Sequence, residues 1–134
     1  MLQYIVAYFA TACVFLAIDY VWLAKIASRF YADRIGHLLM DKPNLPAAGG
    51  FYVMYVVGIV VFAVAPALKS DSLTVALFYG ALFGFFTYAT YDMTNYATLR
   101  GWPFVVVAVD VLWGTVLSGV SALLGTYLTR LLLG

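Results

Sequence analysis

The sequence predicts an all-α integral membrane protein with four transmembrane helices and an amphipathic interfacial helix between the first and the second. Two observations of composition support this fold class. Of the 134 residues, 66% are hydrophobic and 10% are charged, and the mean hydropathy is +1.00, which is more apolar surface than a soluble core of this size can bury. The third observation is that four separate segments are long and apolar enough to cross about 30 Å of hydrocarbon. We therefore expect residues 1–134 to form one transmembrane domain.

The four predicted transmembrane helices span residues 2–24, 51–68, 72–94 and 103–128. Each must be an α-helix, because backbone groups without hydrogen bonds are costly in lipid. The first apolar run is too long for the hydrophobic region of a signal peptide, so we expect it to be retained. The second helix is expected to end near Pro66. The segment "LKSDS" that follows is so short that the second and third helices must form a hairpin.

The connector 25–50 is the one substantial piece outside the predicted spans. Its polar side chains recur at every fourth position, and its apolar side chains lie mostly on another side, as in an amphipathic helix. The polar set is Lys25, Arg29, Asp33, His37 and Asp41. We expect this helix to continue from the first one, to lie in the headgroup layer and to end at Pro43, Pro46 and the Gly49–Gly50 pair. A solvated loop is the alternative.

Positive charge is distributed unequally between the two ends of the predicted bundle. The connector 25–50 and the third connection carry five Lys and Arg, whereas the other side has two, Lys69 and Arg130. The positive-inside rule then places the five in the cytoplasm and both termini outside. The formal net charge of +1 argues against a nucleic-acid partner, because phosphate binding needs a clustered excess of Lys and Arg.

Small residues recur at helical spacing in the third and fourth predicted helices. Gly80 and Gly84 lie one turn apart, and Gly114, Ser118 and Ala122 follow one another at steps of four. Such stripes let helix backbones approach closely in membranes, either within one chain or between copies. Because a unit of four helices is small, we expect a homo-oligomer surrounded by membrane lipids.

Three aspartates are predicted at a common depth in the membrane. Counted from the predicted helix ends, Asp19, Asp110 and Asp92 lie roughly 7, 10 and 12 Å below the cytoplasmic surface. A carboxylate that faces lipid costs several kcal/mol, so intramembrane aspartates usually face a bundle interior or a wet cavity and pair with a partner. Carboxyl groups that interact closely titrate as a unit. This shared layer is the strongest indication of function in the sequence.

The predicted site surrounds these aspartates with aromatic and polar side chains. It comprises Asp19, Asp92, Asp110, Asn95, Arg100, Tyr91, Trp22 and Trp113. Arg100 can reach back toward Asp92 along its own helix. "AIDYVW" and "AVDVLW" each place a tryptophan one helical turn after an aspartate. Aromatic rings beside carboxylates suit an organic cation. The alternative is that Trp22 anchors its helix at the interface and Trp113 fills space.

The sequence has no motif for a nucleophilic triad, a metal site or a phosphate-binding loop. The only histidine, His37, lies in the connector, so no nucleophilic triad is available. The aspartates could in principle coordinate Mg²⁺ or Ca²⁺, but no repeated acidic motif is present and we predict no metal site. Glycine loops that cradle phosphate are absent, and any cofactor stays unidentified.

The segments "AIDYVWL", "TYDMTNYATLRGWP" and "DVLWG", together with the length and the four-helix hydropathy, carry a resemblance. The chain resembles a family of small, predicted inner-membrane proteins of bacteria that is classed as a domain of unknown function. The resemblance covers nearly the whole chain. It implies a bacterial inner-membrane location and a compact four-helix unit, and it implies no activity.

Three classes of function fit these observations. The leading hypothesis is a cytoplasm-facing, acidic and aromatic pocket that binds or transports a small ligand or ion with proton coupling. The second is a membrane enzyme that acts on a lipid or isoprenoid, with one aspartate as general acid or base and Arg100 on the headgroup. The third is a structural or assembly protein whose polar layer only sets helix register.

Overall fold

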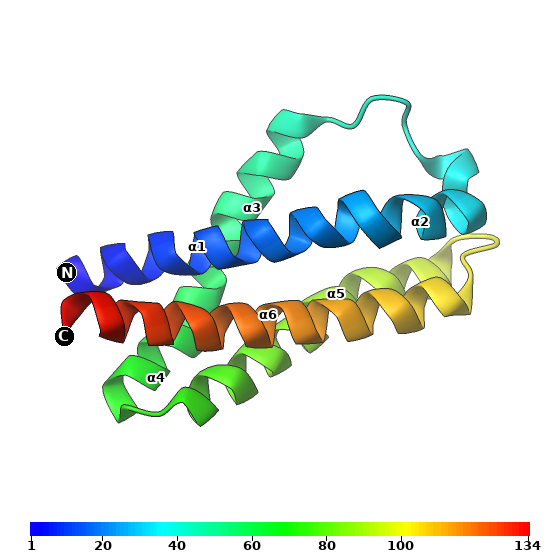
Figure 1. Cartoon of the computed structure of the whole chain (residues 1–134). Helices are drawn as coiled ribbons and strands as arrows, with labels where there is room; N and C mark the ends of the chain where they lie inside the picture. The colour runs from blue at the N-terminus through cyan, green and yellow to red at the C-terminus, as the bar shows by residue number, and fades with distance from the viewer.

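The computed structural model of residues 1–134 is entirely helical (Figure 1). Its α-helices are α1 (Leu2–Trp22), α2 (Ser28–Ile35), α3 (Leu45–Ile59), α4 (Ala65–Ser70), α5 (Leu73–Thr98) and α6 (Phe104–Leu133). π-Helical turns at Leu23–Ala27 and Val60–Val64 join α1 to α2 and α3 to α4, and a 3₁₀ turn follows α2. Four continuous helical stretches are therefore long and apolar enough to cross a membrane. This confirms the predicted fold class.

The first helical stretch is much longer than the predicted 2–24. It runs from Leu2 to Leu38, which is 37 residues, or roughly 55 Å at 1.5 Å per residue. The helix expected in the connector is present as α2, and it continues α1 toward the same end of the molecule (Figure 1). Its apolar side chains Phe30 and Ile35 pack against Trp102 and the start of α6. The amphipathic pattern thus serves packing within the chain.

Two expectations about helix ends in the second span were wrong. Pro46 and the Gly49–Gly50 pair do not end the connector but lie in the first turns of α3, which begins at Leu45. The side chain of Asn44 accepts a hydrogen bond from the backbone N–H of Ala47 at 3.1 Å. A proline in the first turn forfeits no helical hydrogen bond, so Pro46 favours a helix start here. Likewise Pro66 lies in the first turn of α4, which begins at Ala65 after the second π-helical turn and continues to Ser70.

The two remaining connections are short. Between α4 and α5 the chain turns on Asp71, which has a left-handed backbone (φ 53°), and on Ser72, whose hydroxyl caps α5. This is the tight turn of the expected hairpin. Asp71 also forms an ion pair with Arg130 at 3.0 Å. Both termini lie at this end of the molecule, and the connector and the α5–α6 turn lie at the other (Figure 1).

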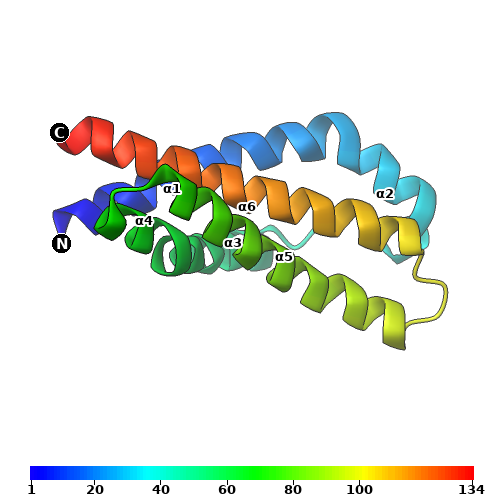
Figure 2. The same cartoon turned by 90° about the horizontal axis from the view of Figure 1, so that it is seen from below.

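The stripes of small residues pack helices within this chain. A Cβ atom added to Gly80 of α5 would lie 2.7 Å from the Cβ of Ala122 and from the backbone oxygen of Ser118 in α6. Gly125 of α6 faces Thr11 of α1 in the same way. These contacts place α6 between α1 and α5, as the two views in Figures 1 and 2 show. The stripes therefore need no second copy to explain them.

The amino-terminal half of α3 diverges from this bundle (Figure 1). The later part of α3 is anchored in the core, where Tyr55, Val56 and Ile59 are buried. Nearer the start of the helix, Leu45 and Phe51 are 71% and 58% exposed. The divergence leaves space among the helices at the end of the molecule that holds the connector, and six of the eight predicted site residues line a cavity there.

Candidate functional site

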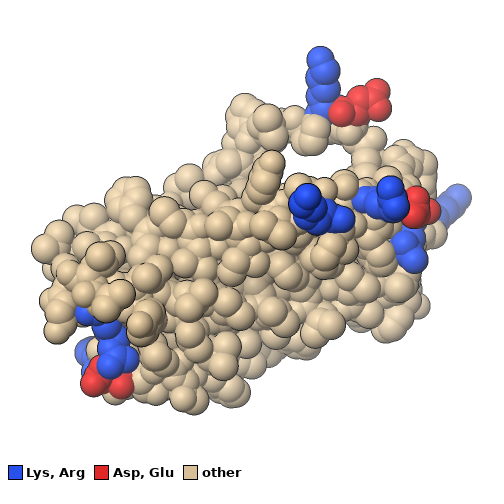
Figure 3. All heavy atoms as spheres, in the orientation of Figure 1, with Lys and Arg blue, Asp and Glu red and all other residues tan.

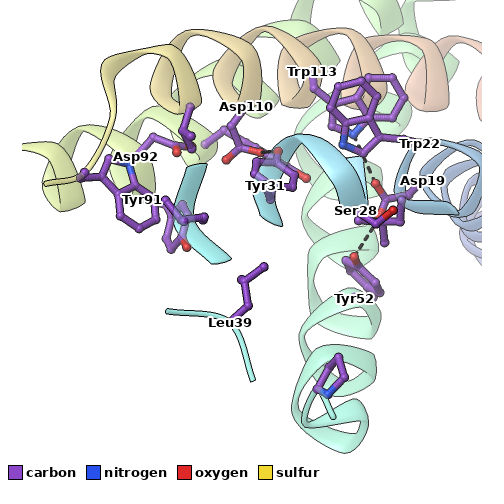
Figure 4. A pocket seen from close by; sticks show the side chains of 16 residues that line it. Asp19, Trp22, Ser28, Tyr31, Leu39, Tyr52, Tyr91, Asp92, Asp110 and Trp113 are labelled. Carbon is purple, nitrogen blue, oxygen red and sulfur yellow. Dashed lines mark hydrogen bonds between the residues drawn. The ribbon is translucent and has the colours of Figure 1, made fainter. Parts of the chain in front are cut away.

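A cavity of about 530 Å³ lies among α1, α2, α3, α5 and α6 (Figure 4). It is in the range of small-molecule sites, about 300–1,000 Å³. Six of the eight predicted site residues line it: Asp19, Trp22, Tyr91, Asp92, Asp110 and Trp113. Leu39 and Pro43 of the connector also contribute to its wall. The structure thus brings the three aspartates, each from a different helix, to one cavity.

Asp19 of α1 is held by two hydrogen bonds. The Tyr52 hydroxyl of α3 donates to its Oδ2 at 2.7 Å, and the Trp113 indole Nε1 of α6 donates to its Oδ1 at 3.2 Å. Only 5% of Asp19 is exposed. One carboxyl group therefore ties α3 and α6 to α1 on the cavity wall (Figure 4). These bonds also satisfy its polar atoms, as buried polar groups require.

Asp110 of α6 has a different partner. The Tyr31 hydroxyl of α2 donates to its Oδ1 at 2.5 Å. Because Tyr31 lies on the helix that continues α1, this bond attaches the start of the connector to the bundle. Together with the packing of Ile35 against Trp102, it closes one side of the cavity.

Asp92 of α5 is the exception among the three. It is fully buried in the protein, lines the cavity, and has no hydrogen-bond partner at either carboxyl oxygen. Its neighbour is the carboxyl group of Asp110, an acid like itself, which can hydrogen-bond to Asp92 only while one of the two carries a proton. The indole Nε1 of Trp102, on the same cavity, is also buried without a partner. Buried polar groups without partners are uncommon, and each requires an explanation.

The tryptophans form the aromatic part of the wall. The rings of Trp22 and Trp113 are stacked, with centroids 4.3 Å apart and an angle of 11° between their planes. Trp22 is half-buried in this stack and so is not solely a lipid-facing anchor. Trp102, in the α5–α6 turn, is only 8% exposed and packs against Val106, Val107 and Ile35 of α2.

Two predicted site residues do not reach the cavity. Arg100 lies beyond the end of α5, is exposed, and forms no salt bridge, since the one ion pair in the structure is Arg130–Asp71. The pairing of Arg100 with Asp92 is therefore absent. Asn95 lies one turn beyond Asp92 on α5, half-buried, and is not among the lining residues.

Sequence reasoning missed three contributors, Tyr31, Tyr52 and Trp102. Tyr31 and Asp110 are 79 residues apart, and Tyr52 and Asp19 are 33 apart. No local pattern could have paired them, because a tyrosine near a helix end normally indicates an interfacial position. One signal could have indicated them. Three intramembrane carboxyl groups need more hydrogen-bond donors than their own helices offer, so donors had to come from other helices. No group of three His, Cys, Asp or Glu side chains lies close enough together to hold a metal ion.

A second cavity, of about 340 Å³, adjoins the first between α3 and α5. The two cavities share the four lining residues Tyr52, Tyr88, Tyr91 and Asp110. The rest of the second cavity is lined by Ala48, Phe51, Tyr55 and Thr87. It occupies the space that the divergence of α3 opens.

Comparison with known families decides what kind of protein carries this site. Residues 4–127 match the family described as "Predicted membrane protein (DUF2177)". The chain belongs to this family. The match covers nearly the whole chain and confirms the resemblance inferred from the sequence, and with the four apolar helices it identifies an integral membrane protein. No curated protein and no solved structure matches the chain.

Proposed function

We propose that this protein binds a small organic cation in the cavity that Asp19, Asp92 and Asp110 line. The observation that carries the proposal is Asp92, a fully buried carboxyl group that faces the cavity with neither oxygen hydrogen-bonded. When Asp92 is ionised, its buried charge has no partner and costs several kcal/mol, and a cationic ligand beside it would offset that cost. In this proposal Asp92 is the ligand-binding carboxylate.

The other two aspartates then have a supporting role. Asp19 and Asp110 each accept hydrogen bonds from side chains of other helices, and so hold Tyr52, Trp113 and Tyr31 in place around the space. The Trp22–Trp113 stack supplies an aromatic surface, which attracts a cation through the ring quadrupole. Carboxylate and aromatic groups together select positive charge and some apolar surface, as in a quaternary ammonium group.

We further propose that the cavity faces the cytoplasm of a bacterial cell from the inner membrane, with both termini outside. On the face shown in Figure 3, charged side chains gather at the two ends and on the connector, and a broad band between them carries none. Five of the seven Lys and Arg residues lie in the connector and in the α5–α6 turn, beside the cavity. The positive-inside rule assigns that end to the cytoplasm.

Transport of the cation, coupled to protons through the aspartates, is the extended form of the proposal. A single four-helix unit is small for a transporter, so this form requires a homo-oligomer with the site inside or between subunits. The second candidate function is a membrane enzyme that acts on a lipid, with Asp92 as general acid or base. The adjoining cavity between α3 and α5 favours it, because a lipid substrate needs a lateral opening. Arg100 would have no part in it, since it lies outside the cavity.

A titration tests the proposal directly. All three tryptophans of the chain, Trp22, Trp102 and Trp113, line the cavity, so intrinsic fluorescence reports on it. Tetramethylammonium is added to the purified protein in a nonionic detergent. We expect a saturable change in fluorescence, and at least a tenfold loss of affinity in Asp92→Asn. The matched control is Asp33→Asn on the exposed face of α2, with affinity unchanged. Equal affinity in Asp92→Asn and Asp33→Asn would refute the proposal.

A further inference from the structure

We infer that the natural ligand is a cationic amphiphile, with its positive head beside Asp92 and an apolar tail in the second cavity between α3 and α5. This inference rests on the proposed cation site and adds the chemistry of the rest of the ligand. It would make the protein a receptor, carrier or enzyme for a single-tailed amine or quaternary ammonium lipid, rather than for a small water-soluble cation.

The first argument is continuity between the cavities. Tyr52, Tyr88, Tyr91 and Asp110 line both of them, so one molecule can occupy the two spaces at once. Asp110 stands where the two meet, and Asp92 lies only in the first. A ligand with its charge at Asp92 therefore has an open direction in which to extend, toward α3.

The second argument is the chemistry of the second cavity. The two hydroxyl groups that line this cavity alone are already engaged, because Tyr55 is hydrogen-bonded to Ser118 at 2.7 Å and Thr87 donates to the backbone oxygen of Phe83 at 2.8 Å. What Ala48, Phe51 and the tyrosine rings offer to an occupant is methyl and aromatic surface. Such a wall favours a hydrocarbon tail, because a polar tail would be buried there without hydrogen bonds.

The third argument is access from the membrane. Ala48 and Phe51 lie on the exposed, diverging half of α3, and Phe51 is 58% exposed. Since α3 begins a helix long enough to span the bilayer, the gap beside it opens sideways toward hydrocarbon rather than only toward water. A tail can therefore enter from the lipid while its charged head remains near the cytoplasmic end.

A series of alkyltrimethylammonium ions from methyl to hexyl tests the inference through the same tryptophan fluorescence. Burying a methylene group from water is worth about a fourfold gain in affinity, so we expect at least a tenfold gain from methyl to hexyl in the wild-type protein. Ala48→Phe, which fills the second cavity, should abolish that gain and leave tetramethylammonium binding intact. Ala47→Phe is the matched control, because Ala47 is an exposed neighbour that lines neither cavity.

The outcomes separate the two proposals. Binding of tetramethylammonium with no gain along the series, or the same gain in Ala48→Phe as in Ala47→Phe, would overturn the tail site and leave the cation site standing. Absence of tetramethylammonium binding that Asp92 controls would overturn both. A second measurement needs no variant: a hexyl tail with a terminal diazirine should crosslink the wild-type protein at Ala48, Phe51 or Thr87. Crosslinks confined to outer positions such as Phe78 and Leu112 would contradict the inference.

Discussion

Replacement of glycine by alanine should lower the stability of the protein at Gly80, where α5 packs on α6, and raise it at Gly50, an open position in α3. In Gly80→Ala the new methyl group would lie 2.7 Å from the Cβ of Ala122 and from the backbone oxygen of Ser118. An ordinary contact needs about 3.4 Å, so the two helices must separate by about 0.7 Å. Overpacking of this kind costs about 1–3 kcal/mol. In Gly50→Ala the methyl group meets nothing within 4 Å, and the helix gains about 0.5–1 kcal/mol of stability.

The assay is reversible unfolding of both variants by sodium dodecyl sulfate in mixed micelles, followed by circular dichroism. We expect the free energy of unfolding to fall for Gly80→Ala and to rise slightly for Gly50→Ala. The double variant Gly80→Ala with Ala122→Gly should recover only part of the loss, because the contact with the Ser118 carbonyl remains. Equal stability of the two single variants would refute the close approach of α5 and α6 within one chain.

Three further predictions concern the walls of the site. Tyr52→Phe removes a donor to Asp19 and should lower the free energy of unfolding by about 1–3 kcal/mol, measured by the same method; no change would mean that this bond does not hold α3. Tyr31→Phe frees α2 from Asp110, so trypsin should cut at Arg29 and Arg34 several times faster than in wild type; an unchanged cleavage rate would contradict the role of Tyr31. Arg100→Gln should leave tetramethylammonium affinity unchanged in the fluorescence titration, because Arg100 lies outside the cavity; a large loss would return Arg100 to the site.

Much of the fold could be predicted from the sequence because the bilayer imposes a simple rule. An apolar run long enough to cross lipid must satisfy its own backbone, and only a helix does so within a single segment. The predicted helix ends were less accurate. The predicted start of the second span at 51 missed Leu45, although Asn44 followed by a proline two residues on is a helix-start pattern. The connector helix was expected to continue from the first helix, as α2 does, but the π-helical turn Leu23–Ala27 that joins them was not, because apolar periodicity does not indicate such a turn.

The sequence predicted which aspartates lie at a similar depth, but it did not predict which side chains donate hydrogen bonds to them. Depth along a helix is set by counting residues, so Asp19, Asp92 and Asp110 could be assigned to one layer. Which hydroxyl meets which carboxyl depends on how helices cross, and the sequence offered Arg100 as the nearest charge when the structure instead supplies Tyr31 and Tyr52. Local spacing favoured a partner on the same helix, whereas contacts between helices satisfy Asp19 and Asp110.

The most direct test of the central claim is Asp92→Leu, which keeps the shape of the side chain and removes its polar atoms. If Asp92 binds a ligand, its buried carboxyl group destabilises the ligand-free protein. Leucine should then raise the free energy of unfolding by about 1–3 kcal/mol, while tetramethylammonium binding disappears. If Asp92 instead belongs to a structural polar network, leucine would destabilise the protein. A fall in the free energy of unfolding, or cation binding that survives in Asp92→Leu, would contradict the account.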